Sequence, residues 1–280
     1  MRGSVRQAGC VPAKTWIVAL GSCIVALGCG APTDVDVRPV GTPEAAAQTR
    51  PSGLPLPPVA REAWPPQPGT AAEAVTAADA LAAGRQLMRG ERYQEAARYL
   101  GIAVELEPSN ADGLRLLGNA QARLNNMPEA LSTLQRAADV APDSAGVHFE
   151  LAMVALISDK LDVAQGAVGR TLELDPQSQR AQELLGTVLH RGGDYEAVLA
   201  LLEPVIAQQP QRDQSRFIVG LSYLGLERFD EARSALEEVI RRQPGHVDAH
   251  LYLAEVLTKL GDEAGATTER ATFRRLSAGR

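Results

Sequence analysis

A 34-residue period runs through the apolar and polar positions of the chain from about residue 77 onward. Its clearest markers are five prolines, Pro108, Pro142, Pro176, Pro210 and Pro244, each 34 residues after the one before. Since proline makes up only about 5% of residues in an average protein, so regular a series does not arise by chance. Self-similarity at this period predicts pairs of helices stacked one after another.

Aligning on these prolines starts the units at residues 77, 111, 145, 179, 213 and 247. The eighth position of every unit is glycine or alanine, the twentieth is alanine in five of the six, and the seventh is mostly large and apolar. Small residues let two helices approach closely where their ridges cross. Gly, Asn or Asp in polar turns such as GERYQEA ends the first helix, and the proline ends the second. Each unit is therefore predicted to be a helical hairpin.

This pattern resembles the tetratricopeptide repeat, a two-helix unit of the same length with small residues at positions 8 and 20 and proline at position 32. The resemblance covers about residues 77–280 and implies an all-α fold, a right-handed superhelical α-solenoid of about six helix-turn-helix hairpins. The hairpins would occupy about residues 77–110, 111–144, 145–178, 179–212, 213–246 and 247–280. The last second helix, TTERATFRRL, is polar over much of its surface, as a terminal cap should be.

In the repeats that this chain resembles, positions 2, 5, 9, 12 and 13 face a concave groove that binds extended peptides or partner helices. The resemblance therefore implies a protein or peptide ligand held on the first helices. The candidate groove residues are Arg85, Arg89, Arg115, Asn119, Arg123, Phe149, Met153, Leu156, Ile157, His190, Phe217 and Leu221.

The candidate residues form a basic part followed by an apolar part. Four arginines can donate forked hydrogen bonds to a carboxylate, and Asn119 can bind a peptide amide through both its donor and its acceptor. The apolar side chains offer a dry pocket for an anchor residue. Two alternatives stay open: the arginines pair with nearby glutamates, or the apolar side chains pack against neighbouring repeats or against linker residues such as Trp64.

The first 28 residues read as a signal peptide. Basic residues precede the apolar run WIVALGSCIVALG at residues 16–28, which is too short to span a bilayer comfortably. The run ends at Cys29, and this resembles a bacterial lipoprotein signal, in which the cysteine is lipidated and becomes the first residue. Cys23 is the second candidate for lipidation, and an ordinary secretory signal or an uncleaved anchor is the alternative.

Residues 29–70 contain ten prolines and no periodic apolar pattern. Such a segment is predicted to be a disordered tether, partly in the polyproline II conformation. The chain is thus expected to consist of a signal peptide (1–28), a Pro-rich tether (29–70) and a repeat domain (71–280).

Composition and motifs narrow the function. The chain is 45% hydrophobic but only 4% aromatic, and its net charge is −6 without a long basic block, so we expect no nucleic-acid partner. The repeat domain has no cysteine, which excludes disulfides and thiolate metal sites there. His246 and His250, in HVDAH, are the one pair with metal-ligand spacing, but no further ligand is evident. No catalytic motif is present, so we expect no enzyme activity, cofactor, metal or small-molecule substrate.

We therefore expect a non-enzymatic scaffold of the bacterial cell envelope, anchored by a lipid at its N-terminus and binding a partner in its groove, for the assembly of an envelope complex. Its expected location is the outer membrane, facing the periplasm, with a periplasmic, secreted or inner-membrane protein as the alternative. The competing function is a secreted or membrane-anchored regulator or subunit of a complex that processes peptidoglycan or polysaccharide.

Overall fold

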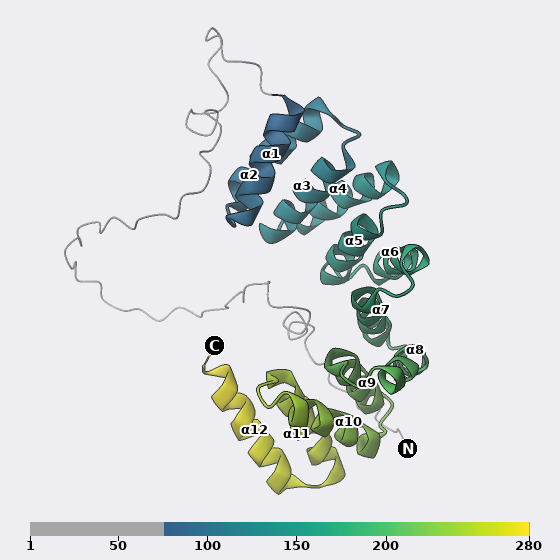
Figure 1. Cartoon of the computed structure of the whole chain (residues 1–280). Helices are drawn as coiled ribbons and strands as arrows, with labels where there is room; N and C mark the ends of the chain where they lie inside the picture. Colours follow the sequence, from purple (N-terminus) through teal and green to yellow (C-terminus); the bar gives the residue numbers. More distant parts are fainter. Residues whose placement is uncertain (1–75, 280) are drawn as a thin grey trace, which may run out of the picture. The chain divides into compact units, whose positions relative to one another are not determined.

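The structure, a computed structural model, describes residues 76–279, which form twelve helices joined by short turns (Figure 1). The helices are α1 (Ala77–Arg89), α2 (Tyr93–Leu106), α3 (Ala111–Arg123), α4 (Met127–Val140), α5 (Ala145–Ile157), α6 (Leu161–Leu174), α7 (Gln179–Gly192), α8 (Tyr195–Gln208), α9 (Asp213–Gly225), α10 (Phe229–Arg242), α11 (Val247–Leu260) and α12 (Glu263–Ser277). None of them combines the length and the apolar character that a membrane crossing requires. The predicted signal peptide, both candidate lipidation cysteines and the tether lie outside the described residues.

The helices are arranged as six successive hairpins. Each odd-numbered first helix packs against the even-numbered second helix that follows it, and each second helix packs against the first helix of the next hairpin. The first helices begin at residues 77, 111, 145, 179, 213 and 247, in step with the 34-residue period. The prediction of an all-α stack of about six hairpins is confirmed.

The first helices lie on the inner side of this stack. Consecutive first helices contact one another, from α1 and α3 through to α9 and α11, whereas consecutive second helices make no comparable contacts within residues 76–279. Figure 1 shows this arrangement in the middle of the stack, where α6 and α8 lie outside α5 and α7. The exposed sides of the first helices form one continuous surface, which we call the inner face.

In the four hairpins that have glycine at position 8, this residue lies against the leucine at position 24 of the same repeat. A methyl group added at Gly118 would lie 2.6 Å from Cγ of Leu134, and Leu134 is completely buried. A methyl group added at Gly84 would lie at the same distance from Cγ of Leu100. Glycine at position 8 therefore makes room for a leucine of the second helix, as expected for helices in close approach.

The third hairpin fills the same space with a different pair of residues. Position 8 is Ala152 and position 24 is Val168, and neither has exposed surface. The extra methyl group on one helix is thus matched by a smaller side chain on the other. Side-chain volume across the crossing is conserved, as close packing requires.

The turns inside all six hairpins share one backbone feature. Position 15 has a positive φ in every repeat, at Glu91, Asn125, Asp159, Gly193, Glu227 and Gly261. A side chain at positive φ costs roughly 1–2 kcal/mol because its Cβ crowds the backbone. Two of the six repeats avoid this cost by having glycine at position 15.

We expect Gly193→Ala to lower the free energy of unfolding by about 1–2 kcal/mol, measured as a shift of the urea midpoint. The added methyl group meets no atom within 4 Å and φ is 81°, so the loss would come from the backbone alone. The control is Gly192→Ala, one residue earlier, where the space is equally open and φ is not positive. Equal stability of the two variants would contradict this account.

The prolines that mark the period also accept hydrogen bonds between repeats. In the last four repeats the side chain at position 4 contacts the proline carbonyl that precedes its helix, at distances of 2.9–3.1 Å. The pairs are His148 with Pro142, Gln182 with Pro176, Arg216 with Pro210 and His250 with Pro244. These contacts fix the start of each first helix against the turn before it.

Candidate functional site

Three neighbouring first helices present matched rows of side chains on the inner face. Positions 5, 9 and 13 of a repeat are four residues apart and therefore lie along one side of a helix. We call the three rows the polar row of α3 (Arg115, Asn119, Arg123), the apolar row of α5 (Phe149, Met153, Ile157) and the polar row of α7 (Glu183, Thr187, Arg191). Since α5 contacts both α3 and α7, the apolar row lies between the two polar rows.

The arginines in the basic part of the predicted groove are largely paired with carboxylates. Arg115 donates to Asp112 Oδ1 at 2.6 Å and to Glu150 Oε1 at 2.7 Å. Arg85 forms an ion pair with the other oxygen of Asp112. For Arg85 and Arg115 the structure thus supports the alternative of pairing with nearby acids, and a partner's carboxylate would have to displace one of these.

The two remaining arginines of this part are exposed. The guanidinium carbon of Arg123 lies 5.8 Å from the centroid of the Tyr93 ring, a cation–π contact. Arg89 forms no ion pair with any other residue of 76–279. Arg89 thus leaves a positive charge at the N-terminal end of the inner face that no other residue of 76–279 pairs.

Glu150 is the most buried carboxylate of this network. Burial raises its pKa above the ordinary glutamate value, and Arg115 and Asn119 offset only part of that rise. Its Oε2 atom is buried and accepts no hydrogen bond from any described residue. Asp112, less buried, has a lowered pKa: burial opposes the shift, but hydrogen bonds from Arg85 and Arg115 outweigh it.

Glu150 should therefore make the stability of the protein depend on pH. With a raised pKa in the folded state, its contribution is complete below the unfolded pKa of about 4.3 and is lost as the pH rises through the folded pKa. We expect the stability of the wild type, relative to Glu150→Gln, to fall as the pH rises from about 4 toward neutrality. Urea unfolding at a series of pH values measures this difference.

Asp112 provides the opposite control. Because its folded pKa is lowered, its contribution is present above the unfolded pKa and is lost as the pH falls through the folded pKa. The wild type relative to Asp112→Asn should therefore lose stability on acidification. If the stability differences between the wild type and each of the two variants changed with pH in the same direction, the assigned pKa shifts would be wrong.

The predicted apolar pocket is only partly exposed, and for three of its residues the prediction is wrong. Leu156, Phe217 and Leu221 are 4%, 1% and 4% exposed, so they belong to the core. The ring of Phe217 lies 4.7 Å from that of His246 and 6.0 Å from that of Tyr252, both in the turn and helix that follow α10. The ring of His246, in the turn after α10, and that of Tyr252, in α11, thus cover Phe217.

The apolar row of α5 stays partly exposed because its neighbours are smaller or polar. The residue equivalent to His246 in the turn after α6 is Ser178, which has no ring to pack on Phe149, and Phe149 is partly exposed. Met153 and Ile157 are likewise partly exposed. These three side chains are the remaining apolar members of the predicted groove.

Two arginines of α7 lie at the two ends of the apolar row. The guanidinium carbon of Arg180 is 4.9 Å from the centroid of the Phe149 ring. Arg191 donates to the carbonyl of Leu156 at 2.8 Å and to Asp159 Oδ1 at 2.6 Å. The groove residues predicted from the sequence do not include Arg180, although it occupies position 2 of its repeat, one of the groove positions of the family.

His190 is a predicted groove residue that is uncharged at neutral pH. Burial lowers its pKa to about 4. Its Nδ1 lies 3.1 Å from Ser222 Oγ, and its ring is 5.1 Å from that of Tyr195. These contacts place His190 between α7, α8 and α9, where it contributes packing rather than charge.

The two histidines with metal-ligand spacing have other partners. His246 Nδ1 accepts from the backbone N–H of Ala249 at 3.1 Å and so caps α11. His250 contacts Glu269 Oε2 at 2.5 Å and the carbonyl of Pro244 at 3.0 Å. Within residues 76–279 no three His, Cys, Asp or Glu side chains are grouped as metal ligands.

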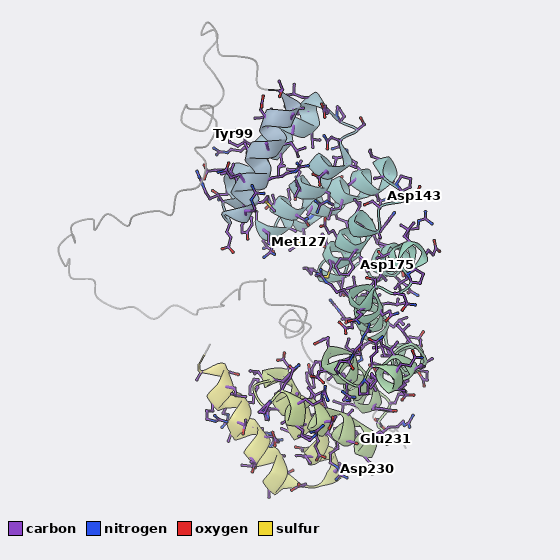
Figure 2. All side chains as sticks on the ribbon, viewed as in Figure 1. Tyr99, Met127, Asp143, Asp175, Asp230 and Glu231 are labelled. Atoms are coloured by element: carbon purple, nitrogen blue, oxygen red, sulfur yellow. The ribbon has the colours of Figure 1, made fainter. Side chains whose placement is uncertain are left out.

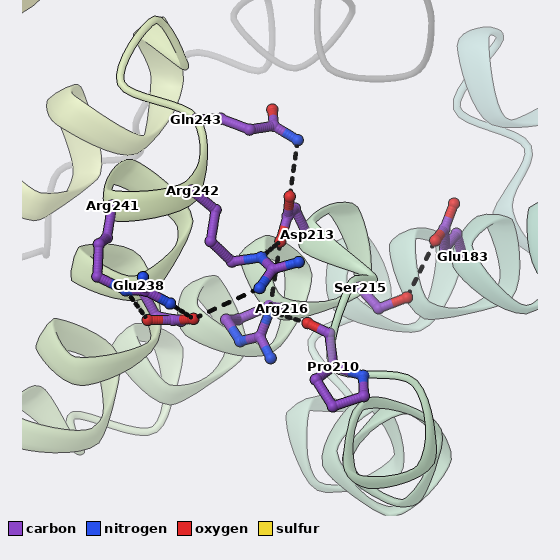
Figure 3. A network of polar contacts seen from close by, with 9 residues as sticks. All are labelled: Glu183, Pro210, Asp213, Ser215, Arg216, Glu238, Arg241, Arg242 and Gln243. Carbon is purple, nitrogen blue, oxygen red and sulfur yellow. Dashed lines mark hydrogen bonds and ion pairs between the residues drawn. The ribbon is translucent and has the colours of Figure 1, made fainter.

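A polar network fixes the fifth hairpin beside this surface (Figure 3). Asp213, the first residue of α9, accepts from Arg242 Nε at 2.5 Å and from Gln243 Nε2 at 2.9 Å at the end of α10. On the other side, Ser215 donates to Glu183 Oε1 of α7 at 3.0 Å. The acid in the polar row of α7 is therefore already engaged by the next repeat.

Acidic side chains outside the inner face gather at the turns and at the starts of second helices. Figure 2 labels four of them, Asp143, Asp175, Asp230 and Glu231, and all four are exposed. Asp230 and Glu231 lie in the first turn of α10, where negative charge is favourable. We interpret these acids as a solvated surface.

The helical stack with this two-helix unit defines the class of protein: an α-solenoid of hairpin repeats. A family model described as tetratricopeptide repeat matches residues 81–146 and 220–272, and a model described as anaphase-promoting complex, cyclosome, subunit 3 matches residues 158–239. The first two hairpins and the last two thus match the tetratricopeptide repeat family.

Solved structures show the same fold at low identity. A tetratricopeptide repeat protein from Parabacteroides merdae is 16% identical, with a TM-score of 0.63 over 69% of this chain and 77% of that one. PilW, a widely conserved type IV pilus biogenesis factor, is 17% identical, with a TM-score of 0.62 over 71% and 92%. YrrB, a repeat protein with an unusual peptide-binding site, is 19% identical, with a TM-score of 0.50 over 64% and 93%.

Proposed function

We propose that this chain is a non-enzymatic protein–protein interaction scaffold that binds a segment of a partner on the inner face, across α3, α5 and α7. The observation that carries the proposal is the partly exposed apolar row Phe149, Met153 and Ile157, bordered on both sides by polar rows. An apolar centre with a polar rim is the usual anatomy of a protein interface. The peptide-binding site named for YrrB is consistent with such a role.

The framework supports this role because it holds the three rows in a fixed register. Contacts at positions 8 and 24 set the two helices of a hairpin, and the ion pairs of Arg115 and Arg191 connect successive repeats. A surface fixed in this way loses little side-chain freedom when a partner binds, which favours affinity.

The test compares two variants that each place a carboxylate at an exposed apolar position. Met153→Glu alters the apolar row, and Val140→Glu alters the end of α4, where Val140 is 41% exposed. The full-length chain is immobilised and used to capture proteins from an extract of the source cells. We expect Met153→Glu to lose a captured protein that the wild type and Val140→Glu retain, with unchanged helicity by circular dichroism. Retention of every captured protein by Met153→Glu would contradict the proposal.

We further propose that the scaffold is held at the outer membrane, facing the periplasm, by a lipid on Cys29 or, as the second candidate, on Cys23. The basic residues, the apolar run and the cysteine at its end support this proposal, and a Pro-rich tether would hold the repeats away from the membrane surface. Mass spectrometry of the protein from the membrane fraction tests it. An acylated Cys29 without residues 1–28 is expected, and an intact Met1 would contradict it.

A further inference from the structure

Three arginines lie around the apolar row of α5, and they differ in whether a carboxylate pairs with them. Arg115 is paired with Asp112 and Glu150, and Arg191 is paired with Asp159. Arg180, by contrast, is exposed and makes neither an ion pair nor a hydrogen bond with another residue of 76–279. One end of the row therefore carries a positive charge that the described part of the chain does not neutralise.

The contact between Arg180 and Phe149 orients this charge. The guanidinium carbon of Arg180 lies over the Phe149 ring, a cation–π contact. Because the guanidinium donates to no other residue of 76–279, its N–H groups stay available for a planar acceptor. The best match for these N–H groups is a carboxylate, which accepts two parallel hydrogen bonds. The contact with the ring also restricts the arginine before binding, which reduces the entropy lost when the carboxylate binds.

The acids of the same region are already occupied. Glu150 accepts from Arg115 at 2.7 Å, and Glu183 accepts from Ser215 at 3.0 Å. A basic partner would have to break one of these contacts or reach the buried Oε2 atom of Glu150, and it would approach Arg180 against like-charge repulsion. An acidic partner needs no such displacement.

Resting on the function proposed above, we infer that the inner face recognises a segment in which an aliphatic or aromatic side chain lies next to a carboxylate. The apolar side chain covers Phe149, Met153 and Ile157, and the carboxylate binds the edge of Arg180. Specificity for acidic over neutral segments then depends on Arg180, and affinity for the anchor depends on the apolar row.

The experiment selects peptides from a phage-displayed library of random dodecapeptides on the immobilised full-length chain. For the wild type we expect enrichment of sequences with an apolar residue within a few positions of Asp or Glu. Arg180→Gln should still enrich the apolar residue but not the acid. A synthetic peptide of the enriched sequence should bind this variant about tenfold more weakly, as expected for the loss of a charge-assisted hydrogen bond.

Two further variants complete the design. Arg180→Lys keeps the charge but loses the planar fork, so its affinity for the peptide should lie between those of the wild type and Arg180→Gln. Met153→Glu should abolish the enrichment, and Val140→Glu should leave it unchanged.

The outcomes separate this inference from the proposed function. Two results would overturn the inference and leave the scaffold proposal standing. The wild type could enrich peptides with apolar residues but without acids, or Arg180→Gln could enrich acidic peptides as strongly as the wild type does. No enrichment by the wild type, or equal enrichment by Met153→Glu, would overturn both.

Discussion

The Phe217→Ala variant is expected to lose about 3–5 kcal/mol of stability, the usual cost of removing a fully buried phenylalanine side chain. Phe217 is 1% exposed and packs against rings of the following repeat, so its removal leaves a cavity between two hairpins. The urea or thermal midpoint of the full-length chain measures the effect. We expect the loss to weaken the last two hairpins first, because each repeat is stabilised mainly by its neighbours.

Phe149→Ala is the matched control, because Phe149 occupies the same position 5 in the third repeat. Its side chain is partly exposed, so its removal should cost much less stability and should weaken partner binding instead. If the two variants lost equal stability, the assignment of one phenylalanine to the core and the other to the inner face would be wrong.

The second large effect is expected at the crossing of α3 and α4. Gly118→Ala places a methyl group 2.6 Å from Cγ of Leu134, and such overpacking typically costs about 1–3 kcal/mol. Leu134→Val alone leaves a small cavity. The double variant recreates the Ala152 and Val168 pair of the third hairpin, so we expect it to be more stable than the sum of the two single effects by about 1–2 kcal/mol.

Gly101→Ala controls for the higher helix propensity of alanine. Gly101 lies inside α2, and a methyl group there meets no atom within 4 Å, so this variant should gain up to about 1 kcal/mol. The difference between Gly118→Ala and Gly101→Ala isolates the contact with Leu134. Additive effects in the double variant would show that the two helices do not share this space.

The fold could be predicted from the sequence because each of its determinants is local and recurs at a fixed spacing. Small residues at position 8, such as Gly118, mark every hairpin, and a proline follows each of the first five second helices. The polar and apolar rows also follow from spacing, since four residues return a side chain to the same side of a helix.

The exposure and pairing of individual side chains could not be predicted in the same way. Phe217 and Phe149 share a repeat position, but their neighbours differ: Phe217 packs against the rings of His246 and Tyr252 and is buried. Phe149 contacts Arg180 and stays partly exposed. The compensation of Arg115 depends on Glu150 of the next repeat, 35 positions away. Arg180 could have been found from position 2 of its repeat, but its contact with Phe149 required the structure.

A partner seated on the apolar row of α5 should perturb Met153, and the methionines of the chain allow a direct test. Of its four methionines, Met153 lies in that row and Met127 begins α4, a second helix (Figure 2). The full-length chain is labelled with ¹³C-methyl methionine and titrated with the peptide selected from the library. We expect the methyl signal of Met153 to shift or broaden in proportion to bound peptide while that of Met127 stays in place. A bound peptide that moves the Met127 signal and leaves the Met153 signal unchanged would contradict a partner seated on this row.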